Sequence, residues 1–218
     1  MKSLFIPNLS TPAGACLTHD NWQRAGVHIV SYDLASWLIK PGLDVLLQFK
    51  NGAVYTGWTE EWVLNLSTLL LDKEGYCLVR SSLDGSKGRF SIDSLISIIV
   101  HLAPDYVFLP KDAQEIWQEK LALVNVKTTL FSPSDQPAYD ALQGLVYQGA
   151  RCFSITAPDE RLNDELIDNH CQCETCSQGF TRAYLHHLYT QTPLLCQRFL
   201  IQHNVFQACH LPQLEISI

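Results

Sequence analysis

Three cysteines and a histidine near the C-terminal end constrain this 218-residue chain more than any other feature. Cys171, Cys173 and Cys176 form a C-x-C-x-x-C motif, and His203 follows on a segment predicted to be the second of two helices. Thiolates spaced this closely cannot all pair as disulfides, but they can bind one tetrahedral zinc ion if a fourth ligand folds back onto them. The sequence therefore predicts a structural zinc site whose four protein ligands leave no position for a catalytic water.

Several histidines compete for the fourth ligand position. Leu195, Phe199 and His203 are spaced four residues apart, so they share one helical face and His203 points inward with the leucine. Two competitors on the helix directly after the motif are too close to fold back easily. The competing histidines are His170, His186, His187 and His210. Redox or iron–sulfur chemistry, or buried free thiols beside a core histidine, are the alternative interpretations.

The bulk composition restricts the compartment and the class of partner. Eight cysteines in a chain of this length, three of them clustered, are typical of a reduced cytoplasmic protein rather than a secreted disulfide framework. The N-terminal residues do not resemble a signal peptide, and no apolar run approaches the ~18 residues of a membrane span. A net charge of −7 argues against tight autonomous nucleic-acid binding. We expect a soluble cytoplasmic protein.

Apolar runs alternate with amphipathic stretches up to about residue 155, which predicts a parallel α/β core. An acidic connector over 158–170 then leads to the cysteine motif. We therefore predict an α/β domain over 1–157 and a helical zinc-binding subdomain over 158–218. The predicted strands are 4–7, 27–31, 62–64, 68–71, 76–80, 88–90, 106–109, 128–131 and 152–155. The predicted helices are 19–25, 35–39, 94–103, 114–123, 136–148, 181–190 and 194–208.

The C-terminal motifs resemble a known family. The cysteine motif over 171–176, the run Thr-Arg-Ala-Tyr-Leu-His-His-Leu over 181–188, and His203-Asn204 are similar to the zinc subdomain of tRNA-guanine transglycosylases. Weaker resemblance extends through the rest of the chain. The segments that carry it are 4–7, 26–31, 39–42, Trp58, 84–109 and 128–155. The resemblance implies a (β/α)₈ barrel with an attached zinc subdomain, and exchange of guanine in the tRNA anticodon for a queuosine precursor base.

The family's catalytic positions have changed in this chain. Where the family carries Asp-Ser-Gly-Gly-Phe-Gln, the residues over 65–70 are Asn-Leu-Ser-Thr-Leu-Leu, so Asn65 replaces the acid/base aspartate. An amide cannot shuttle a proton near neutral pH. Ser154 occupies the position of the aspartate nucleophile, and Lys111 that of a base-reading aspartate. We therefore predict that the chain has no catalytic residues of the family type.

The segment between Pro110 and Thr128 has room for one short helix only, where the family places its fifth and sixth strands. A complete eight-stranded barrel does not fit. We predict an incomplete TIM-type barrel of about six strands, with an exposed edge that needs cover. The five tryptophans are expected in the core.

Loss of the pocket with retention of the zinc subdomain favours a non-catalytic protein that binds a partner. Family members act as dimers, and one family subunit is catalytically silent, so the partner is expected to be a second copy or an active transglycosylase subunit. Exposed apolar groups on the helix of Tyr184, Leu188 and Tyr189 would support this hypothesis.

Two other functions stay open. One is a tRNA- or RNA-binding module, against which residues 151–218 carry four arginines and seven acids. The other is an active enzyme rewired around different carboxylates. Its candidate residues are Asp112, Asp159 and Glu160.

Overall fold

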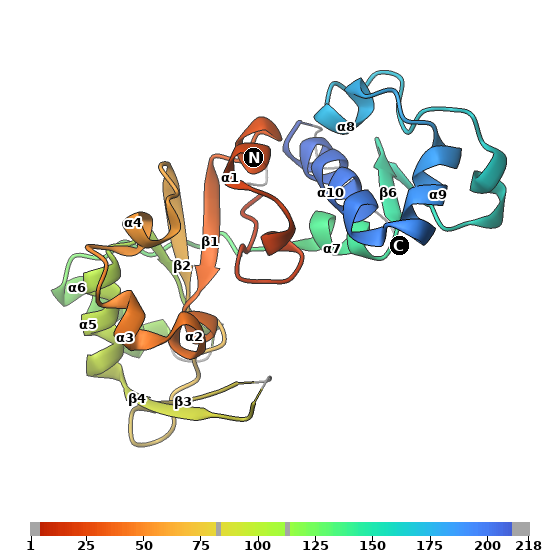
Figure 1. Ribbon diagram of the computed structural model, residues 1–218. Helices are drawn as coiled ribbons and strands as arrows, with labels where there is room; N and C mark the ends of the chain where they lie inside the picture. Colours follow the sequence, from red (N-terminus) through yellow and green to blue (C-terminus); the bar gives the residue numbers. More distant parts are fainter. Residues whose placement is uncertain (1–4, 82–83, 112–113, 211–218) are drawn as a thin grey trace. The chain divides into compact units, whose positions relative to one another are not determined.

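The structure is a computed structural model that describes residues 5–81, 84–111 and 114–210 (Figure 1). Packing within the chain groups these residues into two compact units. The helical unit contains residues 5, 11–28 and 134–210, and the sheet unit contains residues 6–10, 29–81, 84–111 and 114–133. The predicted division at residue 157 stays a prediction, because these units are groups of packed residues rather than tested folding domains.

The sheet unit is built on three parallel strands in the order β1-β2-β5. These strands are β1 (Ile29–Asp33), β2 (Glu61–Asn65) and β5 (Tyr106–Phe108). Four of the five residues of β1 and of β2 are buried, as expected for parallel strands covered on both faces. Asp33 pairs in register with Asn65, so both lie at the carboxyl edge of the sheet.

Helices and one hairpin complete the sheet unit. The hairpin joins β3 (Tyr76–Arg80) to β4 (Lys87–Ser91). Ser91 then caps the longest helix of this unit by accepting a hydrogen bond from the Ser94 amide at 3.2 Å, and Ala103 ends it in a left-handed conformation. The helical segments are α2 (Leu34–Trp37), η2 (Leu38–Gly42), α3 (Leu43–Leu46), α4 (Gly52–Thr56), α5 (Ile92–Leu102) and α6 (Gln114–Leu123).

The helical unit packs around its last helix, α10 (Pro193–His210), which contacts α7, α9 and β6 (Figure 1). A short antiparallel hairpin runs beside it, formed by β6 (Leu145–Gln148) and β7 (Arg151–Ser154). Gly149 supplies the positive φ, +61°, that a two-residue hairpin loop needs. The other elements are η1 (Gly14–Cys16), α1 (His19–Arg24), α7 (Gln136–Leu142), η4 (Pro158–Leu162), α8 (Glu174–Ser177) and α9 (Arg182–Gln191).

Most local predictions hold where a cap or a turn residue marks the boundary. Thr18 caps α1 and Thr181 caps α9, close to the starts predicted for these helices, and α6 has the predicted bounds. The β3–β4 hairpin is confirmed. All five tryptophans are buried, with at most 6% of each residue exposed.

Four local predictions are wrong. Of the strand predicted over 4–7, the described residues 5–7 form no strand, and the chain pairs there only through a bridge between Asn8 and Ser31. The segment 68–71 forms no strand and pairs only through a bridge between Leu71 and Cys77. The segment 128–131 contributes one bridge, Val107 to Thr128. The helix predicted over 136–148 ends at Leu142, because Gly144 adopts φ +78° and the chain then turns into β6. Apolar runs alone cannot distinguish these outcomes.

The fold class is therefore mixed α/β, as predicted, but the strand pairing is less extensive than the sequence predicted. The strands of the described residues form one three-stranded parallel sheet and two hairpins, and a barrel of about six strands is not formed by these pairings. Three of the expected barrel strands are irregular in the structure: the described residues 5–7 of the first, and the segments 68–71 and 128–131. Among the described helices, none has the length and apolar character required to cross a membrane.

Candidate metal centre

Cys171, Cys173, Cys176 and His203 converge in the helical unit, with all four ligand atoms within 4.8 Å of one another. The three sulfur atoms lie 3.6, 3.5 and 3.3 Å from Nδ1 of His203, in chain order. Cys173 also caps α8, its Sγ accepting a hydrogen bond from the Cys176 amide at 3.3 Å. This cap places two of the sulfurs on one side of the cluster.

The residues fit a tetrahedral metal ion. With Zn–S bonds of about 2.3 Å and a Zn–N bond of about 2.0 Å, an ideal tetrahedron separates sulfur from nitrogen by about 3.5 Å. The observed separations of 3.3–3.6 Å agree with that spacing. Thiolate and imidazole ligands favour soft or borderline ions over magnesium or calcium.

A backbone carbonyl fixes the tautomer of His203. Its Nε2 lies 2.6 Å from the carbonyl oxygen of Tyr147, and because a carbonyl only accepts, Nε2 must carry the proton. In the neutral ring, Nδ1 then has the lone pair, and it faces the three sulfurs. Metal-binding histidines commonly donate their second ring nitrogen to a carbonyl in this way.

Because the four groups lie so close together, hydrogen bonds among them raise the pKa of some and lower the pKa of others. Hydrogen bonds from Cys173 and Cys176 lower the pKa of Cys171, and hydrogen bonds to Cys171 and Cys173 raise the pKa of Cys176. Burial lowers the pKa of His203, but hydrogen bonds with Cys171 and Cys173 outweigh it and raise that pKa to about 10. Without a metal ion, shared protons hold the three sulfurs and Nδ1 together. A metal cation would bind these atoms by displacing the protons.

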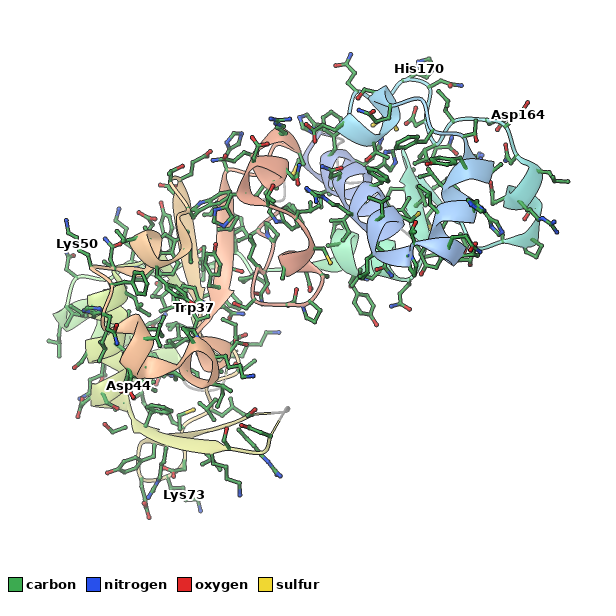
Figure 2. All side chains as sticks on the ribbon, viewed as in Figure 1. Trp37, Asp44, Lys50, Lys73, Asp164 and His170 are labelled. Carbon is green, nitrogen blue, oxygen red and sulfur yellow. The ribbon has the colours of Figure 1, made fainter. Side chains whose placement is uncertain are left out.

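The other histidines lie elsewhere. His186 directs Nδ1 to the carbonyl of Ile155 at 2.8 Å, and His210 is exposed and stacked on Phe206. His170 and His187 are exposed, and Figure 2 shows His170 at the surface of the helical unit. Only His203 joins the cysteines within the part of the chain that is described.

The sequence analysis missed Asn204, which follows the candidate ligand directly. Its Oδ1 accepts from the Tyr147 amide at 2.9 Å, and its Nδ2 donates to the carbonyls of Leu145 and Pro137 at 2.9 and 3.1 Å. The side chain is fully buried. Its position beside His203 in a motif shared with the family was the one signal that could have singled it out.

Comparison with known proteins agrees with this site. The family model for queuine tRNA-ribosyltransferase matches residues 134–212. Over these residues the chain is similar to the queuine tRNA-ribosyltransferases. The enzyme of that name from Helicobacter pylori strain P12 is 27% identical over 160 residues, which cover 70% of this chain and 41% of that protein.

Two further queuine tRNA-ribosyltransferases give similar results. The one from Thermotoga petrophila is 27% identical over 169 residues, covering 74% of this chain and 42% of that protein. The one from Desulforapulum autotrophicum is 35% identical over 69 residues, covering 32% and 18% of the two chains. The chain spans about two fifths of the length of the Helicobacter and Thermotoga relatives.

The two positions at which the family resemblance implies catalytic residues form short local contacts. Asn65 is buried at the end of β2, and its Oδ1 accepts from the Ser67 amide at 2.9 Å. The Ser154 hydroxyl, at the end of β7, shares a 2.7 Å hydrogen bond with the Thr156 hydroxyl. Neither contact supplies a base that would activate a nucleophile.

The carboxylates considered for a rewired enzyme have different surroundings. Glu160 is 5% exposed and forms a 2.6 Å ion pair with Arg182, whose guanidinium stacks on the Phe153 ring at 3.6 Å. A carboxylate held this way has a structural role. Asp159 is exposed, and Asp112 lies outside the described residues.

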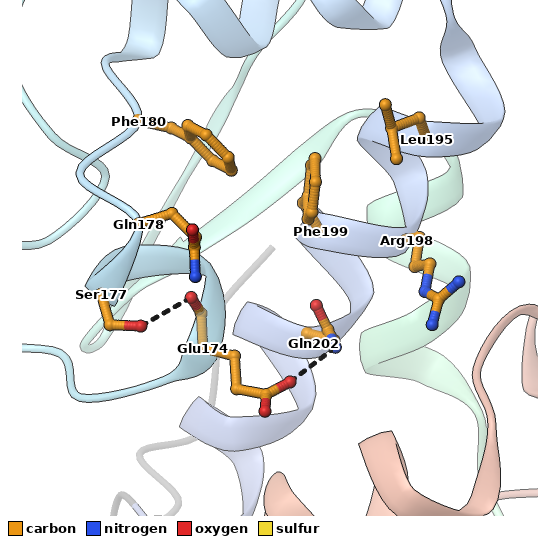
Figure 3. A pocket seen from close by; sticks show the side chains of 8 residues that line it. All are labelled: Glu174, Ser177, Gln178, Phe180, Leu195, Arg198, Phe199 and Gln202. Carbon is orange, nitrogen blue, oxygen red and sulfur yellow. Dashed lines mark hydrogen bonds between the residues drawn. The ribbon is translucent and has the colours of Figure 1, made fainter.

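A surface pocket of about 460 Å³ lies between α8 and α10 (Figure 3). Phe180 and Phe199 form its aromatic wall, with ring centroids 5.0 Å apart, and Leu195 is 45% exposed beside them. Glu174 is held by Arg24 at 2.7 Å and by Gln202 at 3.0 Å. The lining residues are Glu174, Ser177, Gln178, Phe180, Leu195, Arg198, Phe199 and Gln202.

Proposed function

We propose that this chain is a non-catalytic relative of the queuine tRNA-ribosyltransferases that carries a structural zinc ion and acts by binding a protein partner. The partner is a second copy of the chain or an active transglycosylase subunit, which links the chain to queuosine modification of tRNA. One observation carries this proposal: a complete four-ligand cluster is kept, while an amide and a hydroxyl stand where the family uses carboxylates.

Zinc is the ion that best suits this donor set. Three thiolates and one imidazole at tetrahedral spacing are the ligands of structural zinc sites, and none of the eight cysteines, all of them within the described residues, forms a disulfide. Four protein ligands fill the coordination sphere, so a zinc ion here would stabilise the fold and would not activate water. We interpret the three parallel strands of the sheet unit as part of a reduced (β/α) barrel of the family type.

The partner surface that we propose lies on the pocket of Figure 3. Leu195 is 45% exposed, and Tyr184 on α9 is 46% exposed with its ring 5.3 Å from that of Phe180. Large apolar groups gathered around a concave pocket mark interaction sites more often than scattered ones do. The helix predicted to supply this surface does so only through Tyr184, since Leu188 is buried and Tyr189 donates its hydroxyl to the Leu142 carbonyl.

A matched pair of neighbouring leucines tests the partner surface. Leu195→Glu places a charge in the pocket, whereas Leu194→Glu changes a residue that is 80% exposed and does not line it. Light scattering after size-exclusion chromatography measures self-association, and titration against an active queuine tRNA-ribosyltransferase measures hetero-association. We expect association with one of the two partners, weakened more than about tenfold by Leu195→Glu and left unchanged by Leu194→Glu.

Two assays on the same preparation test the other functions. Exchange of labelled guanine out of tRNA would reveal an active enzyme. Binding of tRNA that weakens steeply with salt would indicate an RNA-binding module instead. Either result, without measurable association with a second copy or with the active enzyme, would contradict the proposal.

A further inference from the structure

The outer edge of strand β6 is paired with side chains of helix α10 rather than with another strand. β7 occupies one edge of β6. On the other edge, the Tyr147 amide donates to Oδ1 of Asn204 at 2.9 Å, and the Tyr147 carbonyl accepts from Nε2 of His203 at 2.6 Å. Two consecutive residues of α10 thus hold the amide and the carbonyl of one strand residue.

Asn204 uses its full hydrogen-bonding capacity in this position. Besides accepting from Tyr147, it donates one proton to the Leu145 carbonyl and the other to the Pro137 carbonyl. It therefore ties α10 to β6 and to the first turn of α7. Since His203 and Asn204 are both 0% exposed, water cannot replace these bonds, and the register of β6 against α10 depends on them.

This register determines where the imidazole of His203 points. A shift of β6 along α10 would move the Tyr147 carbonyl away from Nε2, and the ring would lose the contact that holds Nδ1 3.3–3.6 Å from the three sulfurs. Asn204 binds the amide of Tyr147, whose carbonyl binds His203, and so restrains the same strand residue. It has no contact of its own with the cysteines among the hydrogen bonds of the described residues.

We infer that Asn204 is the positioning residue of the metal centre: it holds β6 in the register that aims Nδ1 of His203 at the three thiolates. This inference rests on the proposal that the four residues bind zinc. It also has a consequence in the opposite direction, because coupling between two sites is reciprocal. Binding of the metal at His203 stabilises the β6–β7 hairpin, whose last residue is Ser154.

Substitutions of Asn204 test this role against a control on the same helix. Asn204→Ala removes all three bonds, and Asn204→Asp keeps the acceptor for the Tyr147 amide while losing both donors. Gln197→Ala is the matched control, because Gln197 also donates from α10 to a backbone carbonyl, that of Leu142 at 3.2 Å. Among the hydrogen bonds of the described residues, Gln197 forms none with β6 or with the candidate ligands.

Zinc affinity is measured by competition with a chelator, and ligand geometry by the absorption bands of the Co²⁺-substituted protein. Loss of a residue that orients a metal ligand typically weakens metal binding by about 10–100-fold. We expect that loss and a changed cobalt spectrum for Asn204→Ala, a smaller loss for Asn204→Asp, and affinity within about threefold of wild type for Gln197→Ala. Zinc should slow hydrogen exchange in β6 and β7 of the wild type, and less so in Asn204→Ala.

The outcomes separate this inference from the proposed function. A wild-type protein that binds no zinc would contradict the structural zinc site itself. Wild-type zinc binding with equal affinities in Asn204→Ala and Gln197→Ala would overturn the positioning role alone. Failure of both Asn204 variants to fold in excess zinc, with Gln197→Ala folded, would also overturn it, because Asn204 would then be required for the whole fold.

Discussion

The two units of this protein satisfy their buried polar groups in different ways. In the helical unit, the key partners are far apart in the chain: His203 and Asn204 bond to Tyr147, 56 and 57 residues away. In the sheet unit, the buried residues at the strand ends bond mostly to near neighbours, Asp33 to Ser36 and Asn65 to Ser67. The bonds in the helical unit link separate elements, whereas those in the sheet unit lie mostly within the turn that follows each strand.

This difference predicts how far the effect of removing a polar side chain extends through each unit. A polar group that connects distant elements has no substitute once it is removed, because burial keeps water away from the groups it leaves behind. A group that caps the turn beside it affects one turn. The helical unit should therefore respond cooperatively to changes at its polar centre, and the sheet unit should respond locally at its strand ends.

Removal of the metal should have the largest effect. Structural zinc contributes apparent binding free energies of about 10–16 kcal/mol in zinc-finger peptides, and without it the four ligands keep only their shared protons. We expect chelation to unfold the helical unit and to spare the sheet unit. Trp22 lies in the helical unit, whereas the other four tryptophans lie in the sheet unit. A Trp22→Phe variant therefore separates the two fluorescence transitions, and identical transitions with and without chelator would contradict the prediction.

The buried ion pair of the helical unit should have the next largest effect. Arg182→Met leaves the Glu160 carboxylate, with 7% of its side chain exposed, without its cation. Breaking a buried pair on one side typically costs about 3–5 kcal/mol. Urea unfolding measures this loss. The double variant Arg182→Met with Glu160→Met removes both charges and should recover much of the stability, so an equally unstable double variant would refute this explanation.

Much of the candidate metal centre could be predicted from the sequence. The spacing of Cys171, Cys173 and Cys176 places three sulfurs within one turn and a loop. His203 is buried as predicted, but Leu195, which was expected to point inward on the same face, is 45% exposed. Such arguments need only local geometry. The role of Asn204 and the burial of Glu160 against Arg182 depend on which distant elements meet, and that information is not contained in any local pattern.

The sheet was harder to predict for a related reason. The segments 68–71 and 128–131 have the composition of strands but form only single bridges, Leu71 with Cys77 of β3 and Thr128 with Val107 of β5. The sequence predicts β6 as the end of a helix, because its residues continue an apolar pattern beyond Leu142. Strand formation depends on a pairing partner, and a partner cannot be identified from the strand alone.

A cap in the sheet unit should have a smaller, local effect. Asp33 accepts hydrogen bonds from the Ser36 amide at 2.7 Å and from the Thr68 hydroxyl at 3.3 Å. Loss of such a cap costs about 1 kcal/mol, so Asp33→Ala should lower the free energy of unfolding by about that amount. Zinc affinity should stay unchanged. A loss above about 3 kcal/mol, or weaker zinc binding, would remove the contrast between the two units.

A buried thiol outside the cluster predicts a weak pH dependence. Burial raises the pKa of Cys196 from 9.0 to about 12. The unfolded thiol therefore loses its proton first as the pH rises, and its contribution to stability is complete below about pH 9 and is lost towards pH 12. The loss is about 0.4 kcal/mol at pH 9. Alkylation at pH 8 followed by mass spectrometry should leave Cys196 unmodified and label the exposed Cys152, and rapid labelling of Cys196 would contradict its burial.

Restoring carboxylates at the strand ends should have no effect on activity. Asn65→Asp and Ser154→Asp return the two side chains that the family resemblance implies, but the former lies where Leu66 and Leu69 are fully buried, and neither substitution restores the glycines of the family motif. We expect no exchange of labelled guanine from tRNA by either variant or by the double variant, with each protein folded by circular dichroism. Because a carboxylate needs a positioned ribose to act as a nucleophile, restoring the charge alone is insufficient. Measurable exchange by the double variant would mean that the purine site persists and that only its reactive groups were lost.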